Sequence, residues 1–219
     1  MRTDLLRKTV LTTAGAVFAG GAIAAPITAA SAFNAAPTTD KPAAVQADRK
    51  GERELRVDYQ AQPNFYYCGP AAARNALSVQ GKDIDVDSMA ERMGTTEAGT
   101  NSINDITPVL NKETGKDVYR SVEISSPRAD DKQTDKLRAD IVRTIDDGRA
   151  VVANIAGTAT DVDGGLHSFE GGHYISVTGY RDSGHEVKIA DSANPNTAEY
   201  WITTDALADW IATRGYSTN

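Results

Sequence analysis

The chain has 219 residues, which fits one ordinary domain and leaves room for two only if both are small. Its 40% hydrophobic and 24% charged residues are typical of a globular protein rather than of a disordered or fibrous one. With a formal net charge of −7, the chain lacks the basic surface that phosphate-backbone binding needs, so we expect no nucleic-acid partner. The single cysteine excludes an intramolecular disulfide framework and a cysteine-based zinc site.

Residues 1–32 have the features of a secretory signal peptide. Arg2, Arg7 and Lys8 give a positive start, an apolar stretch follows, and the small residues 30–32 offer a cleavage site. The apolar stretch is too short and too interrupted by threonines and glycines for a membrane anchor, and no charged stop follows it. We therefore expect a secreted, extracellular protein with no stable membrane insertion after the signal is removed.

Residues 33–53 are rich in Ala, Pro, Thr and charge and show no apolar periodicity, which predicts a flexible leader or short pro-segment. The folded domain is expected over 54–219. It begins where Leu55, Val57 and Tyr59 alternate with polar residues, as in a strand.

Helices are expected in the first half of this domain and strands in the second. Apolar spacing and capping residues predict helices over 69–80, 87–93, 102–110 and 135–147, with a strand over 118–124. Runs rich in Val, Ile and Tyr then predict strands over 151–155, 174–180, 186–190 and 199–202, before a closing helix over 205–213. Helices packed on a later antiparallel sheet make an α+β fold.

Cys68 directly precedes the helix expected from residue 69. Free N–H groups and the positive end of the helix dipole favour the thiolate there, which is the nucleophilic form of cysteine. In an exported protein, a lone cysteine is either an intermolecular bridge or a reactive thiol. A buried, inert cysteine remains the alternative.

His173 follows two glycines at the start of a predicted strand, where it can face a cleft and serve as a base. Such a base needs a third group that holds its tautomer. Asp191 ends the next predicted strand, and the short turn at 181–184 makes the two strands a hairpin. Hairpin geometry therefore predicts that Asp191 lies beside His173. Gln62, six residues before Cys68, could donate its side-chain amide to a developing oxyanion.

Three stretches of the chain, taken in order, resemble the C39-like cysteine peptidase family of the papain-like superfamily. They read QPNFYYCGPAAARNAL, GRAVVANIAG and GGHYISVTGYRDSGHEVKIADSANP, and they run from Gln62 to Asp191. The resemblance implies a papain-like α+β fold in which the thiol-bearing helix packs on the sheet. It also implies Gln62 as oxyanion donor, Cys68 as nucleophile, His173 as acid and base, and Asp191 as its orienting partner.

This sequence departs from the family pattern after the aspartate. The family has Pro directly after it, whereas residues 192–194 intervene here before Pro195. Asn194 is therefore an alternative to Asp191 as the residue that orients His173, although the hairpin argument favours Asp191.

No cofactor or metal is expected. His167, His173 and His185 lack the helical spacing of a zinc set, and the calcium-like run 161–164 has Ala159 where its first ligand would stand. The glycines in residues 161–172 predict a mobile flap over the cleft.

The sequence thus predicts a secreted, monomeric cysteine peptidase that cleaves peptide or protein substrates. Two alternatives stay open. An acyltransferase or transpeptidase would use the same acyl-enzyme, and a non-catalytic exported binding or inhibitory module would use the cysteine only to pack or to couple to a partner.

Overall fold

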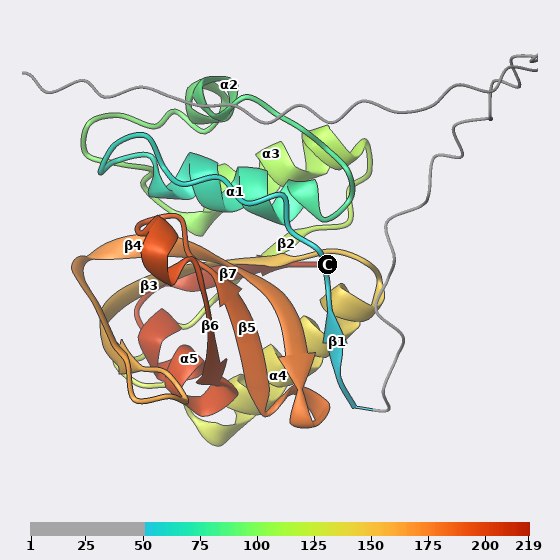
Figure 1. Ribbon diagram of the computed structural model, residues 1–219, viewed down its shortest axis with the longest axis vertical. Coiled ribbons are helices and arrows are strands. Elements are labelled where there is room, and N and C mark those ends of the chain that lie inside the picture. The colour runs from blue at the N-terminus through green and yellow to red at the C-terminus, as the bar shows by residue number, and fades with distance from the viewer. Residues whose placement is uncertain (1–50) are drawn as a thin grey trace, which may run out of the picture. The chain divides into compact units, whose positions relative to one another are not determined.

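The computed structural model of the protein describes residues 51–219 (Figure 1). The signal peptide expected over 1–32, and all but the last three residues of the leader expected over 33–53, lie outside the described residues.

One antiparallel sheet forms the centre of the described domain. Its strands follow the order β2-β7-β3-β4-β5-β6, and β1 pairs with β4 beside this path. The strands are β1 (Arg53–Glu54), β2 (Arg120–Glu123), β3 (Val151–Thr160), β4 (Leu166–Arg181), β5 (Glu186–Ala190), β6 (Glu199–Thr203) and β7 (Gly215–Thr218). The strand pairs of this sheet within residues 51–219 are all antiparallel, because hairpins and long returns connect the strands.

Helices cover both faces of this sheet (Figure 1). On one face lie α1 (Cys68–Ser78), α2 (Val86–Arg92) and α3 (Ile103–Thr114), and on the other lie α4 (Asp131–Asp146) and α5 (Thr204–Ile211). Two short 3₁₀ turns, Asp182–Gly184 and Pro195–Thr197, complete the elements. The expected α+β arrangement is confirmed, with one addition: α4 packs on the face opposite to α1, so the sheet is covered on both sides.

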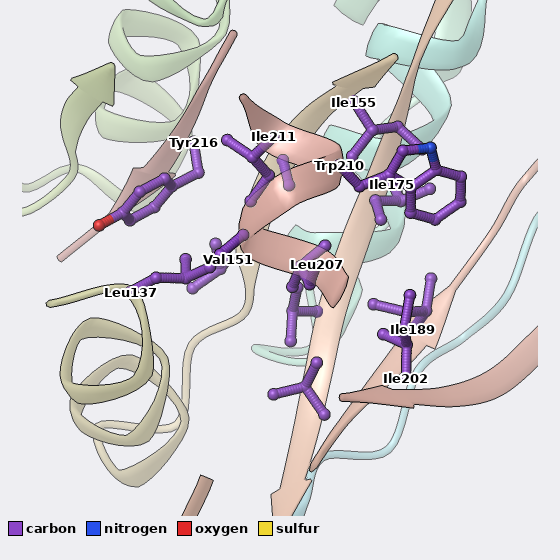
Figure 2. Packing of buried hydrophobic residues seen from close by; sticks show 14 of the residues in the cluster. Leu137, Val151, Ile155, Ile175, Ile189, Ile202, Leu207, Trp210, Ile211 and Tyr216 are labelled. Carbon is purple, nitrogen blue, oxygen red and sulfur yellow. The ribbon is translucent and has the colours of Figure 1, made fainter. Parts of the chain in front are cut away.

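The central strands are buried on both faces, and their side chains alternate between two hydrophobic clusters. Val151 and Ile155 of β3 point into the cluster beneath α4 and α5, whereas Val152 points into the cluster beneath α1 and α3. Figure 2 shows the first cluster, where Leu207 of α5 meets Ile175 and the neighbouring strand residues. Burial of each large aliphatic side chain contributes about 1.5–3 kcal/mol, so this shared sheet holds both helical layers.

The strand expected from Leu55 to Tyr59 is wrong, because β1 ends at Glu54. The chain is extended there, and the backbone N–H of Leu55 still donates to the Thr178 carbonyl of β4 at 2.8 Å. Farther along, the backbone donors bind helix α1 in place of another strand. The backbone N–H of Asp58 donates to Ser78 Oγ at 3.0 Å, and that of Gln60 donates to Asn75 Oδ1 at 2.9 Å. The alternation of burial is therefore present without a β-ladder.

The flap expected over residues 161–172 is a regular hairpin in the structure. Strand pairing continues from Gly157 opposite Phe169 to Thr160 opposite Leu166. Asp161 fixes the turn, because its carboxylate accepts from the backbone N–H groups of Asp163 and Gly165 at 2.9 and 2.7 Å. The glycines here make a turn and a bulge rather than a hinge.

Candidate active site

Cys68 is the first residue of α1, so the helix begins one residue before the start expected at residue 69. No side chain caps this helix, so its first N–H groups and positive dipole end surround the thiol. A Cβ atom added at Gly69 would lie 2.5 Å from Thr100 Oγ1 and 3.5 Å from a ring carbon of Tyr174. The glycine therefore lets the start of α1 approach the sheet closely, and the buried thiol of Cys68 stands against it.

His173 lies within the long strand β4, directly after an irregularity in the sheet. The pairing of β3 with β4 shifts register between Ile155, opposite His173, and Gly157, opposite Phe169. Gly172 has a φ of +95°, which glycine adopts without strain. This bulge ends the outer hairpin and redirects the chain at His173, whose ring is buried and stacks on Phe169 with centroids 4.0 Å apart.

Asp191 follows β5 and binds the imidazole of His173. Its Oδ1 accepts from His173 Nε2 at 2.8 Å and from the backbone N–H of Ala193 at 2.9 Å. Its Oδ2 accepts from the Tyr200 hydroxyl at 3.2 Å, and its backbone carbonyl accepts from the Tyr59 hydroxyl at 2.9 Å. The carboxylate is thus held from several sides and fixes the orientation of the ring.

Asn194 has a different contact. Its side-chain oxygen accepts from the backbone N–H of Asn196 at 3.0 Å and caps the 3₁₀ turn Pro195–Thr197. The carboxylate of Asp191, rather than the amide of Asn194, therefore contacts His173.

The imidazole of His173 also hydrogen-bonds to the Cys68 thiol. Because Nε2 binds Asp191, Nδ1 is the ring nitrogen left for the sulfur. Burial lowers the pKa of His173, but the hydrogen bonds to Asp191 and Cys68 and their negative charges outweigh it and raise that pKa to about 9. Burial likewise raises the pKa of Asp191, yet the bond from His173 holds it below its usual range. The raised pKa therefore favours a protonated His173 imidazolium beside the Cys68 sulfur.

Gln62 is anchored beside this cluster through the segment that follows Asp191. Its Nε2 donates to the Asn64 carbonyl at 2.8 Å, and its Oε1 accepts from Ser192 Oγ at 3.1 Å. Its backbone N–H donates to the Ser192 carbonyl at 2.9 Å. The amide group is oriented by these bonds and retains a second N–H for a ligand.

Three contacts at the site went unnoticed in the sequence: the stack of Phe169 on His173 and the hydroxyls of Tyr59 and Tyr200 on Asp191. Tyr200 also stacks on His167, whose Nε2 lies 2.8 Å from Asp161 Oδ2. His167 thus belongs to the hairpin that packs beside the site. No local motif marks these residues, because strand register places Phe169 and Tyr200, and the extended segment after β1 places Tyr59.

Two features bear on metal binding and membrane contact. Within residues 51–219, no group of three or more His, Cys, Asp or Glu side chains is arranged to hold a metal ion. Across the same part of the chain, no helix has both the length and the apolar character that crossing a membrane requires.

A mixed helix and antiparallel-sheet domain with a thiol at the start of its buried helix is the architecture of papain-like cysteine peptidases. The sequence matches the Peptidase_C39 like family over residues 54–218. The chain therefore belongs to the Peptidase_C39 like family and is a cysteine peptidase, which confirms the expected family and enzyme class. No curated protein sequence matches the chain significantly.

Solved structures of low sequence identity share the fold. The peptidase domain of Streptococcus ComA, described as a bi-functional ABC transporter involved in a quorum-sensing pathway, is 14% identical with a TM-score of 0.50, covering 75% of this chain and 98% of that one. A Bacillus anthracis protein described as a C39-like peptidase is 11% identical with a TM-score of 0.51, covering 75% and 94%. These likenesses confirm the papain-like α+β fold.

A double glycine motif protease from an AMS/PCAT transporter, crystallised with a leader peptide, is 12% identical with a TM-score of 0.47. It covers 76% of this chain and 94% of that one.

Proposed function

We propose that the protein hydrolyses peptide bonds of peptide or protein substrates with Cys68 as nucleophile, His173 as acid and base, and Asp191 as the residue that orients His173. One observation carries this proposal: His173 hydrogen-bonds to Asp191 at 2.8 Å through one ring nitrogen and to the Cys68 thiol as well. A buried imidazole between a thiol and a carboxylate is the arrangement that nucleophilic catalysis by cysteine requires.

The chemical steps follow from these positions. The Cys68 thiolate attacks the carbonyl carbon, and the electron pair of the carbonyl moves to its oxygen. The His173 imidazolium then gives its proton to the leaving amine as the C–N bond breaks, which leaves a thioester. Neutral His173 next takes a proton from water, whose oxygen attacks the thioester. The acid product leaves, and the thiolate and imidazolium are restored.

Gln62 and the uncapped N-terminus of α1 are proposed to stabilise the oxyanion. The support is that the Gln62 amide is held by Asn64 and Ser192 with one N–H to spare, while no side chain occupies the first N–H groups of α1. Donors that are fixed before the reaction stabilise developing charge without a reorganisation cost.

A digest of a defined peptide library by the purified protein tests this proposal, with products identified by mass spectrometry. Cys68→Ala should abolish cleavage, and Gln62→Ala should lower kcat about 10²–10³-fold. Gln60→Ala is the matched control, because Gln60 is exposed and only its backbone is held. All variants should unfold at the temperature of the parent protein. Cleavage by Cys68→Ala at the parent rate would contradict the mechanism.

The same digest decides between water and an amine as acyl acceptor. A hydrolase gives mainly free-acid products when an amine such as glycinamide is added in excess at neutral pH, with only a minor fraction trapped as the amine adduct. An acyltransferase would instead give mainly the amine adduct, with little free acid. If the parent protein bound peptides as well as the Cys68→Ala variant does and formed no product, the non-catalytic alternative would be favoured.

We also propose export with cleavage after residue 32. The support is the positive start, apolar stretch and small-residue exit in residues 1–32. Amino-terminal sequencing of the protein recovered outside the producing cells should begin at Phe33 or within the leader. An intact Met1 in the extracellular protein would exclude this cleavage.

A further inference from the structure

A small cavity of about 210 Å³ lies where the start of α3, the end of β2, strand β3 and the segment before β7 meet. Its lining is mostly polar and consists of Asn101, Ser102, Ile103, Glu123, Ser125, Asn154, Thr213, Arg214 and Gly215. The volume is large enough for a peptide side chain or the end of a peptide, so it does not by itself select a ligand. The chemistry of the lining therefore decides what the cavity accepts.

Arg214 is the cation of this lining, and it stands without an acidic partner in the described residues. Its Nε is buried and has no hydrogen-bond partner there. Four other arginines of residues 51–219 share such an Nε, but each forms an ion pair through its other nitrogens: Arg53, Arg74, Arg138 and Arg149. Arg214 differs because no described carboxylate lies within 4.0 Å of it, so its charge remains to be matched.

The backbone that presents Arg214 is strained. Thr213 has a φ of +67°, a left-handed conformation that is unusual for a β-branched residue. Gly215 directly follows Arg214. A Cβ atom at Gly215 would lie 2.6 Å from the Val122 carbonyl, so a glycine is needed there for β7 to pair with β2. Such strain persists only where the surrounding structure fixes it, and it often marks functional positions.

The cavity borders the candidate active site. The Arg214 guanidinium lies 3.5 Å from where a Cβ of Gly172 would stand, and Gly172 directly precedes His173. On the other side, Asn154 Nδ2 donates to the Tyr174 hydroxyl at 3.0 Å. The Tyr174 ring in turn contacts the start of α1 at Gly69. A group bound in the cavity is thus next to residues that adjoin both Cys68 and His173.

The charges around the cavity favour an anion on the Arg214 side. The N-terminus of α3 adds a positive dipole end at Ser102, although the capping box with Asp105 already binds the Ser102 N–H. Glu123 stands at the exposed rim, and its carboxylate accepts from Asn104 Nδ2 at 2.8 Å. It opposes an incoming anion, but it is not paired with Arg214.

We propose that this cavity is a specificity subsite in which Arg214, with Asn154 beside it, binds a carboxylate of the peptide substrate. The planar guanidinium offers paired N–H donors that match a carboxylate, and Asn154 Nδ2 has a second hydrogen to give. The carboxylate comes from an acidic side chain or from the C-terminus of the peptide. This inference rests on the proposed peptidase function for the nature of its ligand.

The test measures binding without cleavage. The full chain carrying Cys68→Ala is incubated with two random peptide libraries of the same composition, one with free C-terminal acids and one amidated, and retained peptides are identified by mass spectrometry. Retained peptides should be enriched in carboxylates. Enrichment of Asp and Glu in both libraries identifies an acidic side chain, and enrichment confined to the free-acid library identifies the C-terminus.

Substitutions then assign the preference to Arg214. Adding Arg214→Gln should reduce the enrichment roughly 10- to 100-fold, which is the worth of a charged hydrogen-bonded pair, and Arg214→Lys should restore part of it. Arg128→Gln is the matched control, because Arg128 is an exposed arginine outside this cavity. Glu123→Gln keeps Arg214 and removes the opposing rim charge, so it should strengthen the enrichment about two- to fivefold.

An undiminished carboxylate preference in a folded Arg214→Gln variant would overturn the subsite, as would a parent protein with no such preference. The outcome is separable from that of the proposed function. Retention of acidic peptides through Arg214 by a protein that cleaves nothing would remove the peptidase mechanism and leave the subsite. Cleavage with no carboxylate preference would do the reverse.

Discussion

The protonation of His173 is set by two neighbours against the effect of burial. A buried imidazole alone loses its proton more easily, yet the hydrogen bonds to Asp191 and Cys68 raise the pKa of His173 to about 9. At neutral pH the ring therefore carries its proton. In the proposed mechanism that proton is the one delivered to the leaving amine, so the charge state is ready before substrate binds.

This charge state predicts the alkaline side of the pH profile. Because the imidazolium is the acid, kcat/KM for peptide cleavage should fall as pH rises through about 9. Asp191→Asn removes a negative charge that raises the pKa of His173, so the fall should begin at lower pH, and the rate at the optimum should also drop. Initial rates on one library-derived peptide between pH 6 and 10.5 provide the measurement.

Asn194→Ala is the control for this profile. Asn194 caps a 3₁₀ turn three residues from Asp191 and has no hydrogen bond to His173, so its loss should leave the alkaline limb in place. A profile that shifted with Asn194→Ala and stayed fixed with Asp191→Asn would reverse the assignment of the orienting residue.

Some contacts of the candidate site follow from local sequence patterns, and others depend on how distant strands pair. The position of Cys68 at a helix start, and the approach of Asp191 to His173, follow from a proline-containing helix signal and one short hairpin turn. Tyr200 and Arg214 reach the site through the register of β6 and the strained entry to β7. Such register depends on packing across the whole sheet, which no local pattern records.

One buried carboxylate adds a polar link between helix α4 and the sheet, beside the hydrophobic cluster that they share. Asp140 accepts from Lys136 Nζ and Arg143 of its own helix at 2.6 Å each, and from the Tyr216 hydroxyl of β7 at 2.9 Å. Burial raises the pKa of Asp140, but these hydrogen bonds outweigh it and hold that pKa below its usual range. Arg120 of β2 also donates to Asp140 at 3.1 Å, so the buried carboxylate links the sheet-facing side of α4 to strands β2 and β7.

Asp140→Asn should lower the free energy of unfolding by roughly 1–3 kcal/mol, because the buried Tyr216 hydroxyl and the two cations of α4 lose a charged acceptor. The half-exposed cations keep part of their hydration, which limits the loss. Asp135→Asn serves as control, since that exposed carboxylate pairs only with Arg138 on the same helix. Urea unfolding followed by circular dichroism gives both values. Equal effects of the two substitutions would contradict the linking role of Asp140.

The presence of each helix could be predicted, but some of the starts could not. Ser102 caps α3 where the sequence predicts that helix to begin, whereas Asp85 caps α2 two residues before the start expected from the sequence. Helix α4 begins at Asp131, four residues before the expected start at 135, because a capping box at Asp130 extends it through residues without apolar spacing. Strand β7 was not predicted, because its four residues have no distinctive pattern. It forms a strand because β2 and β3, which lie on either side of it, provide hydrogen-bond partners for its backbone N–H and C=O groups.

At the scale of the whole domain, one sheet serves two helical layers. The thiol comes from α1 on one face, and the imidazole and carboxylate come from strands that also form the cluster under α4 and α5. The fold class was predictable because helices precede most of the strands along the chain. The coverage of both faces was not, because the apolar pattern of a helix does not say which face of a sheet it covers, and only packing assigns the sides of α1 and α4.

A shared sheet predicts that the two layers unfold together. Leu77 of α1 and Leu207 of α5 are fully buried in opposite clusters, so Leu77→Ala and Leu207→Ala should each cost about 2–5 kcal/mol of stability. Both should unfold in one transition, in which tryptophan fluorescence, circular dichroism and peptidase activity change at the same urea concentration, because each cluster needs the strands that the other packs against.

Leu166→Ala is the chemically matched control, because Leu166 is 75% exposed at the hairpin tip and should leave the midpoint within the error of the parent. If Leu77→Ala abolished activity at a urea concentration where the fluorescence of Trp210 in α5 stayed native, the layers would be independent, and α1 could leave the sheet without unfolding the rest.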